Sequence, residues 1–542
     1  MKTFLHFSFI LISSACIAQT APGTSCALNK RSAHAHARVA SHSAALADTS
    51  IDVRHYKLDL KLSYDFTATA PYYMYKHLQG SVTIKAQNLK DTNHKIHLNL
   101  RNAGLTVDSV FVKGVNHTFV HNEDLIQIPL PKSLQKDEVF TITVHYHGLP
   151  EATGFGSFIF ATHGNPAKPA IHSLSQPYGA ADWFPCKNDP SDKADSSEVW
   201  ITAPSELISV SNGILQGITT QGAYKTYQWK TKYPIAQYLI FIASAQYDLY
   251  EDVYHDSTTT KHMPITHYLF PEINTIENKG LMDETNYMMK LFSNRFGPYP
   301  FLDEKYGHAI IAIQGGGMEH QTCSSMSDFG SGLVAHELAH QWFGDKITCA
   351  SWEHIWLNEG FATYAELIYS ENKKGRDDYN YIMSLLMASA RTAHGSLYVT
   401  STEINEIFSS NRTYHKGAVV LHMLRNIVGD TTFFDILKTY MSSSHAYGNA
   451  TTEDFQAIAE KVSGQNLDYF FSQWIYGSNY PKYKVGIKID TVPDNQHMYT
   501  VHMRVVQAPT NPNPSFFTMP IKLRITLVDS SYQDIRVFNN QP

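Results

Sequence analysis

Two histidines four residues apart, with a glutamate beside the first, are the residues of this chain best suited to bind a metal ion. They are His336 and His340, and Glu337 lies between them. On a helix, residues four apart project from the same face about one turn apart, so both imidazoles can reach one ion. Eighteen residues separate His340 from Glu359, enough to end the first helix and enter a second. Glu359 then completes a predicted zinc site of two histidines and one carboxylate, which leaves the fourth position to water.

Glu337 is the predicted general base, because it would stand beside that water without being a ligand. The same five-residue pattern also occurs by chance in ordinary buried helices, so the flanking residues decide between the two interpretations. Ser331 and Gly332 suit a helix start, Gly344 suits its end, and the apolar residues between them can face a core. These flanks favour the metal site.

Glu366 lies seven residues after Glu359, two helical turns on and on the same face. A carboxylate at that position can hold a ligand histidine by its other ring nitrogen. A solvated helix glutamate fits the position equally well, so the sequence leaves both interpretations open.

The composition describes a multidomain protein without a nucleic-acid partner. The 542 residues suffice for about three domains, 43% of them are hydrophobic, and a net charge of −6 with a pI near 6.5 gives no basic footprint. Residues 1–18 have the short apolar run and small residues of a secretory signal peptide, which predicts export to a periplasm or the exterior. Acylation of Cys16, as in a lipoprotein, is the alternative. No later stretch approaches the roughly 20 apolar residues of a membrane span.

The cysteines do not indicate a second metal site. Cys26, Cys186, Cys323 and Cys349 remain after removal of the signal peptide, and their spacing is that of neither a zinc knuckle nor a disulfide scaffold. Cys323 and Cys349 flank the predicted zinc helix. They could pair in an oxidising compartment, or both could be buried free thiols.

The hydrophobic period divides the chain into successive regions. Residues 19–50 resemble a flexible leader, and residues 51–248 show alternation typical of strands, which predicts one antiparallel β domain. Residues 249–480 are mainly helical, and residues 481–542 return to short strands, which predicts a small C-terminal β-sandwich that is incomplete where the chain stops. The expected strands lie within 56–62, 80–86, 95–100, 125–130 and 140–146, and the expected helices within 281–296, 379–390, 416–428, 432–441, 452–462 and 466–476.

Two further segments carry candidate substrate-binding residues. Gly316 and Gly317 follow a predicted buried strand and lead directly to Glu319, sixteen residues before the zinc motif. Glycines at a strand end let the backbone approach a ligand closely, although a glycine turn with an exposed acid is the simpler interpretation of the stretch alone. Gln176 lies in an irregular, aromatic-rich segment of the β region, where it suits either a substrate contact or a plain loop.

With these residues assembled, the sequence resembles the zinc aminopeptidases of the aminopeptidase N and leukotriene hydrolase family, a group of gluzincins. The resemblance runs from about Ile51 to the end of the chain. It rests on four motifs in the family's order, listed here by residue: Gln176 before Pro185, Gly316–His320, His336–His340 with Glu359, and Tyr414–Ala418.

The resemblance implies a multidomain α+β architecture, with a β domain before a thermolysin-like, mainly helical zinc domain. It implies one Zn²⁺ per chain, held by His336, His340 and Glu359. Glu337 would activate water and pass the proton to the leaving amine, and Tyr414 would stabilise the oxyanion. The remaining implied roles concern the substrate, a peptide with a free N-terminus: Glu319 and Gln176 would hold its α-amino group, and the backbone at Gly316 and Gly317 would line its path.

Three departures from the family pattern affect the expected substrate contacts. His320 replaces a commoner asparagine, and Ala181 stands where relatives often carry arginine. The large helical C-terminal domain of many members does not follow, so a more open cleft is expected. Tyr414 also has a simpler interpretation, as a core tyrosine at a helix start.

Two other functions are compatible with parts of the pattern. A thermolysin-like endopeptidase would use the same ligand set but would cleave peptides with a blocked amine. A non-catalytic peptide-binding protein on the same fold would be expected to have lost one of His336, Glu337, His340 or Glu359, and all four are present. The sequence therefore favours an exported zinc aminopeptidase.

Overall fold

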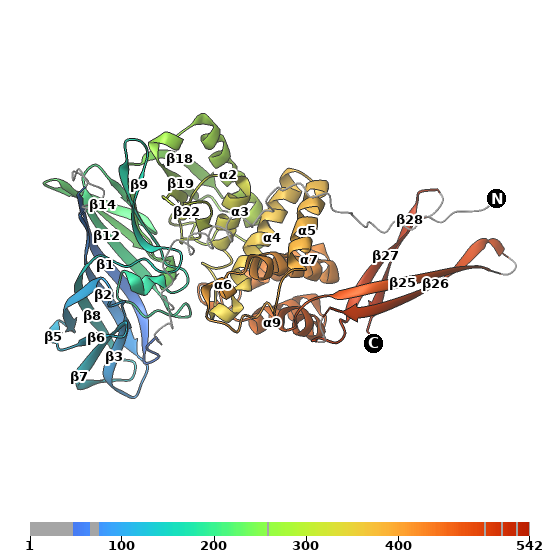
Figure 1. The fold of residues 1–542 in the computed structure, drawn as a ribbon, viewed down its shortest axis with the longest axis horizontal. Coiled ribbons are helices and arrows are strands. Elements are labelled where there is room, and N and C mark those ends of the chain that lie inside the picture. Colours follow the sequence, from blue (N-terminus) through green and yellow to red (C-terminus); the bar gives the residue numbers. More distant parts are fainter. Residues whose placement is uncertain are drawn as a thin grey trace.

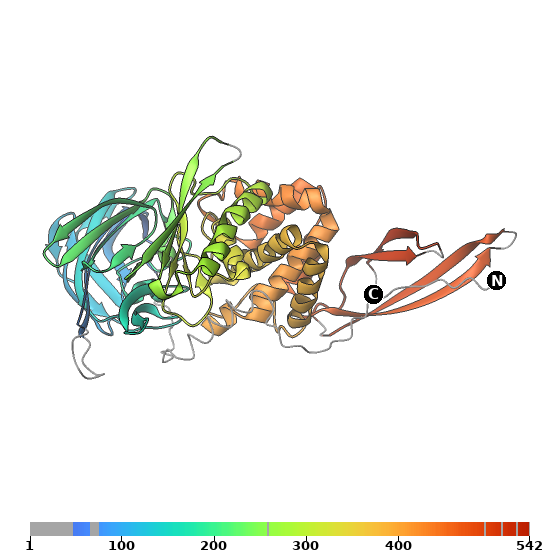
Figure 2. The same ribbon diagram turned by 90° about the horizontal axis from the view of Figure 1, so that it is seen from above.

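The protein is described by a computed structural model that covers residues 47–65, 75–256, 259–492, 495–510, 513–526 and 529–540. Three regions follow one another along the long axis (Figure 1). A β domain occupies one end, a mainly helical domain lies in the middle, and two β hairpins project from the other end in both views (Figures 1 and 2). Residues 1–46, which carry the predicted signal peptide, most of the predicted leader and Cys26, lie outside the described residues.

The N-terminal β domain is built from strands that bury alternate side chains, as the period-2 pattern predicts. Its eight-stranded sheet has the order β14 (Ile214–Gln221), β15 (Tyr224–Thr231), β12 (Ser196–Pro204), β1 (Ile51–Asp65), β2 (Tyr75–Asn88), β8 (Val139–Gly148), β4 (Leu105–Val112) and β5 (Val115–His117). A four-stranded sheet has the order β13 (Ile208–Val210), β17 (Ala243–Ala245), β10 (Lys168–Leu174) and β9 (Ser157–His163). A three-stranded sheet has the order β3 (Thr92–Asn99), β7 (Leu125–Gln135) and β6 (Val120–Asn122). Strands β11 (Lys193–Ala194) and β16 (Ile235–Ala236) form a two-stranded sheet.

All five expected strands of this region are confirmed, and the expected antiparallel pairing holds except between β1 and β12. Strand β1 pairs with β12 in parallel, with Leu58 opposite Val199, and pairs with β2 on its other edge antiparallel. Parallel neighbours need a long connection, and here the chain passes through many other strands between β1 and β12. An alternating pattern shows which face of a strand is buried and not the direction of its partner.

The middle domain combines a second sheet with a layer of helices. The sheet order is β18 (Asp248–His255), β19 (His262–Leu269), β20 (Tyr306–Ile310), β22 (Ser324–Met326) and β21 (Gly317–Met318), which puts β21 at an edge. The helices are α2 (Ile276–Phe296), α3 (Ser331–His340), α4 (Trp356–Lys373), α5 (Arg376–Ala390), α6 (Ile404–Ile407), α7 (Gly417–Val428), α8 (Asp430–Met441), α9 (Thr452–Ser463) and α10 (Asp468–Phe471). A π-helical turn, Ser410–Lys416, precedes α7, and another, Ser472–Tyr476, follows α10. Strands β23 (Thr348–Cys349) and β24 (Asn449–Ala450) form a short parallel pair.

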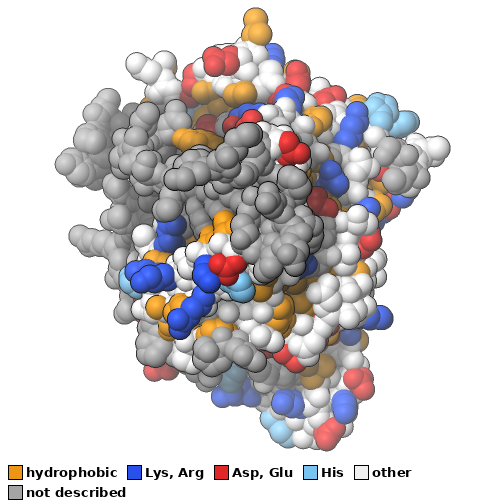
Figure 3. All heavy atoms as spheres, turned by 90° about the vertical axis from the view of Figure 1, so that its right-hand side faces the viewer, with side chains coloured by type: hydrophobic (Ala, Val, Ile, Leu, Met, Phe, Trp, Pro, Cys, Tyr) orange, Lys and Arg blue, Asp and Glu red, His pale blue; other side chains and the backbone are white. Residues whose placement is uncertain are grey.

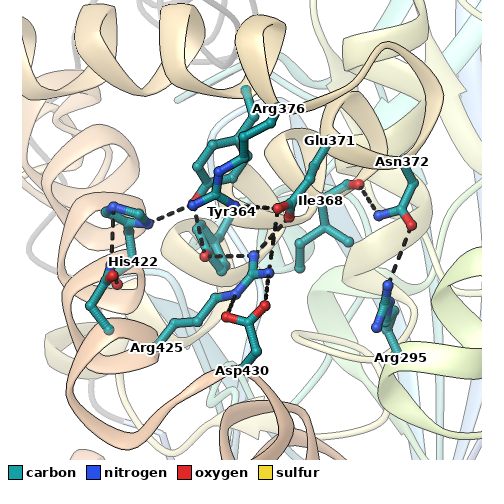
Figure 4. Close-up of polar contacts among 11 residues, drawn as sticks. Arg295, Tyr364, Ile368, Glu371, Asn372, Arg376, His422, Arg425 and Asp430 are labelled. Atoms are coloured by element: carbon teal, nitrogen blue, oxygen red, sulfur yellow. Dashed lines mark hydrogen bonds and ion pairs between the residues drawn. The ribbon is translucent and has the colours of Figure 1, made fainter. Parts of the chain in front are cut away.

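An arginine on α7 ties three of these helices together (Figure 4). The Nε and Nη2 of Arg425 donate to the two carboxylate oxygens of Asp430, at 2.9 and 2.8 Å, and its Nη1 donates to Glu371 at 2.8 Å. Asp430 begins α8 and Glu371 belongs to α4, so a single guanidinium fixes the packing of three helices. The Arg425 side chain is only 7% exposed, which makes these charge-assisted hydrogen bonds stronger than surface pairs.

Replacing Arg425 by methionine is expected to destabilise the helical domain by roughly 2–3 kcal/mol, because Glu371 would lose its buried partner. We expect the thermal unfolding midpoint to fall by roughly 5–10 °C. Calorimetry measures the shift. Lys438→Met is the matched control, since Lys438 is exposed on α8, and an equal shift in the two variants would contradict the assigned role.

The C-terminal strands form where the sequence predicts, but they do not assemble a β-sandwich. Strand β25 (Pro481–Val492) pairs only with β26 (Asn495–Pro509), and β27 (Met519–Thr526) pairs only with β28 (Tyr532–Asn539), among the described residues. A two-stranded ribbon has no second sheet to cover its apolar side chains, and Tyr483, Ile487 and Phe538 are exposed. The alternating pattern predicts strands correctly and carries no information about a facing sheet.

The buried core runs continuously from Ile51 through both larger domains, and Phe517 is its last member. Met288 and Met289 of α2 are fully buried in it. Cys186, Cys323 and Cys349 are buried free thiols, so the pairing of Cys323 with Cys349 is not formed. None of the described helices combines the length and the apolar character needed to cross a bilayer.

Candidate active site

Helices α3 and α4 bring the three predicted metal ligands to one point. The Nε2 atoms of His336 and His340 lie 3.1 Å apart, and each lies 3.3 Å from Oε2 of Glu359. Zinc bonds of about 2.0–2.1 Å at tetrahedral angles would place ligand atoms about 3.3 Å apart. The three side chains, all buried, therefore form one face of a tetrahedron with the dimensions that zinc requires. The donor set of two imidazoles and one carboxylate fits the same ion.

Each ligand histidine is oriented through its other ring nitrogen. Nδ1 of His336 lies 2.8 Å from Oε1 of Glu366, and Nδ1 of His340 lies 3.0 Å from the backbone oxygen of Phe343. Both acceptors fix Nδ1 as the protonated nitrogen and turn Nε2 toward the metal. Glu366 is thus the buried partner of His336 rather than a solvated helix residue.

Glu337 points from α3 toward the glycine-rich segment that ends in β21. A Cβ atom added to Gly317 would lie 2.6 Å from Oε1 of Glu337, closer than any side chain permits. Only glycine lets the backbone of β21 pass so near this carboxylate, which explains the residue type at 317. Gly316 precedes it with a φ of +79°, a left-handed conformation that also favours glycine.

Glu319 and Gln176 meet across the two domains. Nε2 of Gln176 donates to Oε1 of Glu319 at 2.7 Å, and both side chains are buried. Oxygens of Glu319 and Glu337 lie within 4.8 Å of each other and of a ring nitrogen of His340. The β domain therefore contributes an amide to a carboxylate that stands beside the predicted metal and base.

Tyr414 reaches the same centre from the π-helical turn before α7. Its ring stacks on His336 at a centroid separation of 5.9 Å and an angle of 15°. Gly360 on α4 and Gly417 on α7 allow this approach, because a Cβ on Gly360 would lie 3.0 Å from the Cα of Gly417. Larger residues at either position would push the turn, and Tyr414 with it, away from the site.

The carboxylates set the charge preference of the centre. Burial lowers the pKa of His336, but Glu359 and Glu366 outweigh burial and raise it to about 10. Burial likewise lowers the pKa of His340, while Glu319 and Glu359 bring it above its usual value. The field of the site thus favours positive charge at the imidazoles, where a metal ion would take the place of protons.

The ring of His320, the departure from the family pattern, makes two contacts within the protein. Its Nδ1 lies 2.9 Å from Oγ of Ser325, and its ring stacks on Phe241 at 4.5 Å. Ala181 is buried beside the irregular segment that carries Gln176.

Sequence reasoning missed two residues near the centre. Tyr238 is buried, and its hydroxyl lies 3.5 Å from Nδ2 of Asn358. Burial, and to a lesser extent the charge of Glu319, raises the pKa of Tyr238. Asp345 is buried five residues beyond His340, and burial, followed by Glu319, raises its pKa well above its usual value. An acidic residue directly after Gly344, at the end of the zinc helix, is a pattern that could have indicated Asp345. Tyr238 lies in an apolar run of the β domain, and nothing in the sequence around it indicates a role at the site.

Two profiles of one protein family match the sequence. Residues 53–239 match the Peptidase M1 N-terminal domain, and residues 283–474 match the Peptidase family M1 domain. The chain belongs to peptidase family M1. The sequence-based resemblance to zinc aminopeptidases is thereby confirmed at the level of the family.

Relatives and solved structures agree with M1 membership. Aminopeptidase M1 of Arabidopsis thaliana is 26% identical over 474 residues, which are 80% of this chain and 51% of the relative. Aminopeptidase M1-D of Oryza sativa is 29% identical over 332 residues, 56% of this chain and 36% of the relative. This chain therefore spans between about a third and a half of the length of these curated M1 relatives.

The M1 zinc metallopeptidase from Deinococcus radiodurans superposes with a TM-score of 0.69 at 26% identity, over 81% of this chain and 96% of that one. A mutant of that protein has been solved with a Tyr-Ser-Ala substrate bound and matches this chain with a TM-score of 0.69 at 27% identity. The expected order of a β domain before a helical zinc domain is confirmed for this M1 protein.

Proposed function

We propose that this protein is a zinc-dependent aminopeptidase that removes residues one at a time from the free N-terminus of peptides. One observation carries the proposal: the Glu319 carboxylate lies within 4.8 Å of both Glu337 and His340. In a peptide, the α-amino nitrogen and the first carbonyl carbon are only about 2.5 Å apart. An ammonium held by Glu319 would therefore put the first peptide bond beside the base and the metal ligands.

The side chains have separate tasks in this reaction. Zinc, when bound by His336, His340 and Glu359, supplies Lewis acidity to the scissile carbonyl and to water. The Glu337 carboxylate accepts the proton of the attacking water and delivers it to the leaving amine. The Tyr414 hydroxyl donates a hydrogen bond to the oxyanion that develops on the substrate.

The position of β21 at the edge of its sheet supports binding of the peptide substrate in an extended conformation. Strand β21 pairs with β22 through Gly317 opposite Met326 and lies at the edge of its sheet, the position at which an extended peptide can align with a strand. A peptide added there would run past Gly316 and Gly317 toward Glu319. The buried pair of Glu319 and Gln176 then ends the path at the α-amino group, which disfavours the endopeptidase alternative.

Replacing Glu319 by glutamine tests this proposal. We expect kcat/KM for leucine amide to fall about 30-fold or more, because the ammonium loses a buried charged partner. Zinc content should stay unchanged. Glu277→Gln, an exposed change of the same chemistry on α2, is the control. Undiminished turnover of leucine amide by the Glu319 variant would contradict the proposal.

Tyr414→Phe is expected to lower kcat about 100-fold, since one hydrogen bond to the oxyanion is lost. KM and zinc content should change little, because the ring still packs on His336. Steady-state kinetics with leucine amide measures both constants. A rise in KM with normal kcat would assign Tyr414 to substrate binding instead.

We also propose one zinc ion per chain and export of the protein. The single ion is supported by the ligand atoms of His336, His340 and Glu359, which lie close enough together to bind one ion. Export is supported by residues 1–18, which resemble a signal peptide. N-terminal sequencing of the mature protein tests the second point, with Gln19 as the expected first residue.

A further inference from the structure

A cavity of about 440 Å³ lies where helices α5 and α7 meet the first residues of the C-terminal hairpins, and none of the three metal ligands lines it. Its walls are mainly apolar and come from distant parts of the chain: Met387, Val419, Met423, Trp474, Met519 and Ile521. The volume is in the range of small-molecule sites, and methionine walls adapt to flexible apolar ligands.

Lys416 is a buried charged residue in the wall of this apolar cavity. The residue is 5% exposed, and its ammonium forms no hydrogen bond or ion pair with another residue of the described ranges. Burial, with the nearby charge of Arg412 as the lesser cause, lowers the pKa of Lys416 to about 8. A buried cation without a partner carries a desolvation cost that a bound anion would offset.

The other charged residue among the described residues of the lining is also basic. Arg391 lines the cavity and is exposed, and no aspartate or glutamate is found among the described residues that line it. Seen from the end that bears the hairpins, hydrophobic side chains lie among basic and acidic ones on the described surface (Figure 3). An anionic head with an apolar body would match the basic and apolar residues of the lining, and a neutral or cationic ligand would leave Lys416 unpaired.

We propose that this cavity binds an amphipathic carboxylate of the fatty-acid class, with its carboxylate on Lys416 and its alkyl chain between the methionines of α5, α7 and β27. The ion pair would be largely desolvated, and the chain would replace water against apolar walls. The proposal is independent of the peptidase activity. It assigns a ligand to the junction between the helical domain and the hairpins.

Calorimetric titration of the whole protein with dodecanoate, dodecanol and dodecyltrimethylammonium tests the proposal. Dodecanoate should bind at least tenfold more tightly than the other two probes, and chelator should not change its affinity, which separates this cavity from the metal site. Lys416→Met should weaken dodecanoate binding by about 10- to 100-fold, the contribution of a charged hydrogen bond. Lys438→Met, on the exposed face of α8, should leave it unchanged.

Val419→Trp supplies a second test that keeps Lys416. The indole would take up part of the cavity where the alkyl chain is proposed to lie, so dodecanoate binding should weaken while the thermal midpoint of the protein is retained. The proposal is overturned if the wild type binds no dodecanoate, if dodecanol binds as tightly, or if chelator abolishes binding. Unchanged dodecanoate affinity in folded Lys416→Met or Val419→Trp protein would also overturn it.

Discussion

Glutamine in place of Glu337 is expected to lower kcat by about 10²- to 10⁴-fold, because the amide cannot accept the proton of the attacking water. The zinc content should remain that of the wild type, since Glu337 stands beside the metal ligands and is not one of them. The shape of the side chain is kept, so the close packing of Glu337 against Gly317 should also survive. Steady-state kinetics with leucine amide, together with metal analysis of the same sample, measures both quantities.

Glu277→Gln on α2 is the control for this change as well, because it makes the same substitution at an exposed site. Near-normal turnover by the Glu337 variant would assign the base to another residue. Loss of zinc would show instead that Glu337 contributes to metal binding.

Alanine in place of Glu359 is expected to remove both zinc and activity. His336 and His340 would remain as two neutral ligands, and the variant would lack the carboxylate that balances the charge of the ion. We expect the zinc content to fall to near zero after dialysis and the hydrolysis of leucine amide to become undetectable. Metal analysis and the same kinetic assay measure the two effects.

Glu366→Gln provides a graded comparison. Glu366 holds Nδ1 of His336 at 2.8 Å and does not face the metal position, so the variant should retain zinc with affinity lowered about 10- to 100-fold. Equal zinc loss in the Glu359 and Glu366 variants would contradict the distinction between ligand and supporting residue.

The metal ligands were predictable because their geometry is local. His336 and His340 are one helical turn apart, and the position of Glu366 relative to Glu359 follows from the same helical period. Local periodicity also predicted the five named strands of the β domain and most of the helices. The boundaries assigned to the signal peptide, the leader and the domains remain predictions.

The missed features depend on contacts between residues far apart in the chain. Tyr238 comes from the β domain and reaches Asn358 on α4, a separation that no local pattern reveals. The acceptor for His340 is a backbone oxygen, which has no signature in the residue type of Phe343. The parallel pairing of β1 with β12 and the two isolated hairpins are likewise decided by partners rather than by the strands themselves.

The most direct measurement of the central claim compares leucine amide with N-acetyl-leucine amide as substrates of the wild-type protein, with and without a zinc chelator. Glu319 and Gln176 meet beside the base and the metal ligands, so a free ammonium should be required for productive binding. We predict rapid, chelator-sensitive hydrolysis of leucine amide and nearly none of the acetylated compound. Comparable hydrolysis of both compounds, or activity that survives complete removal of zinc, would contradict the account.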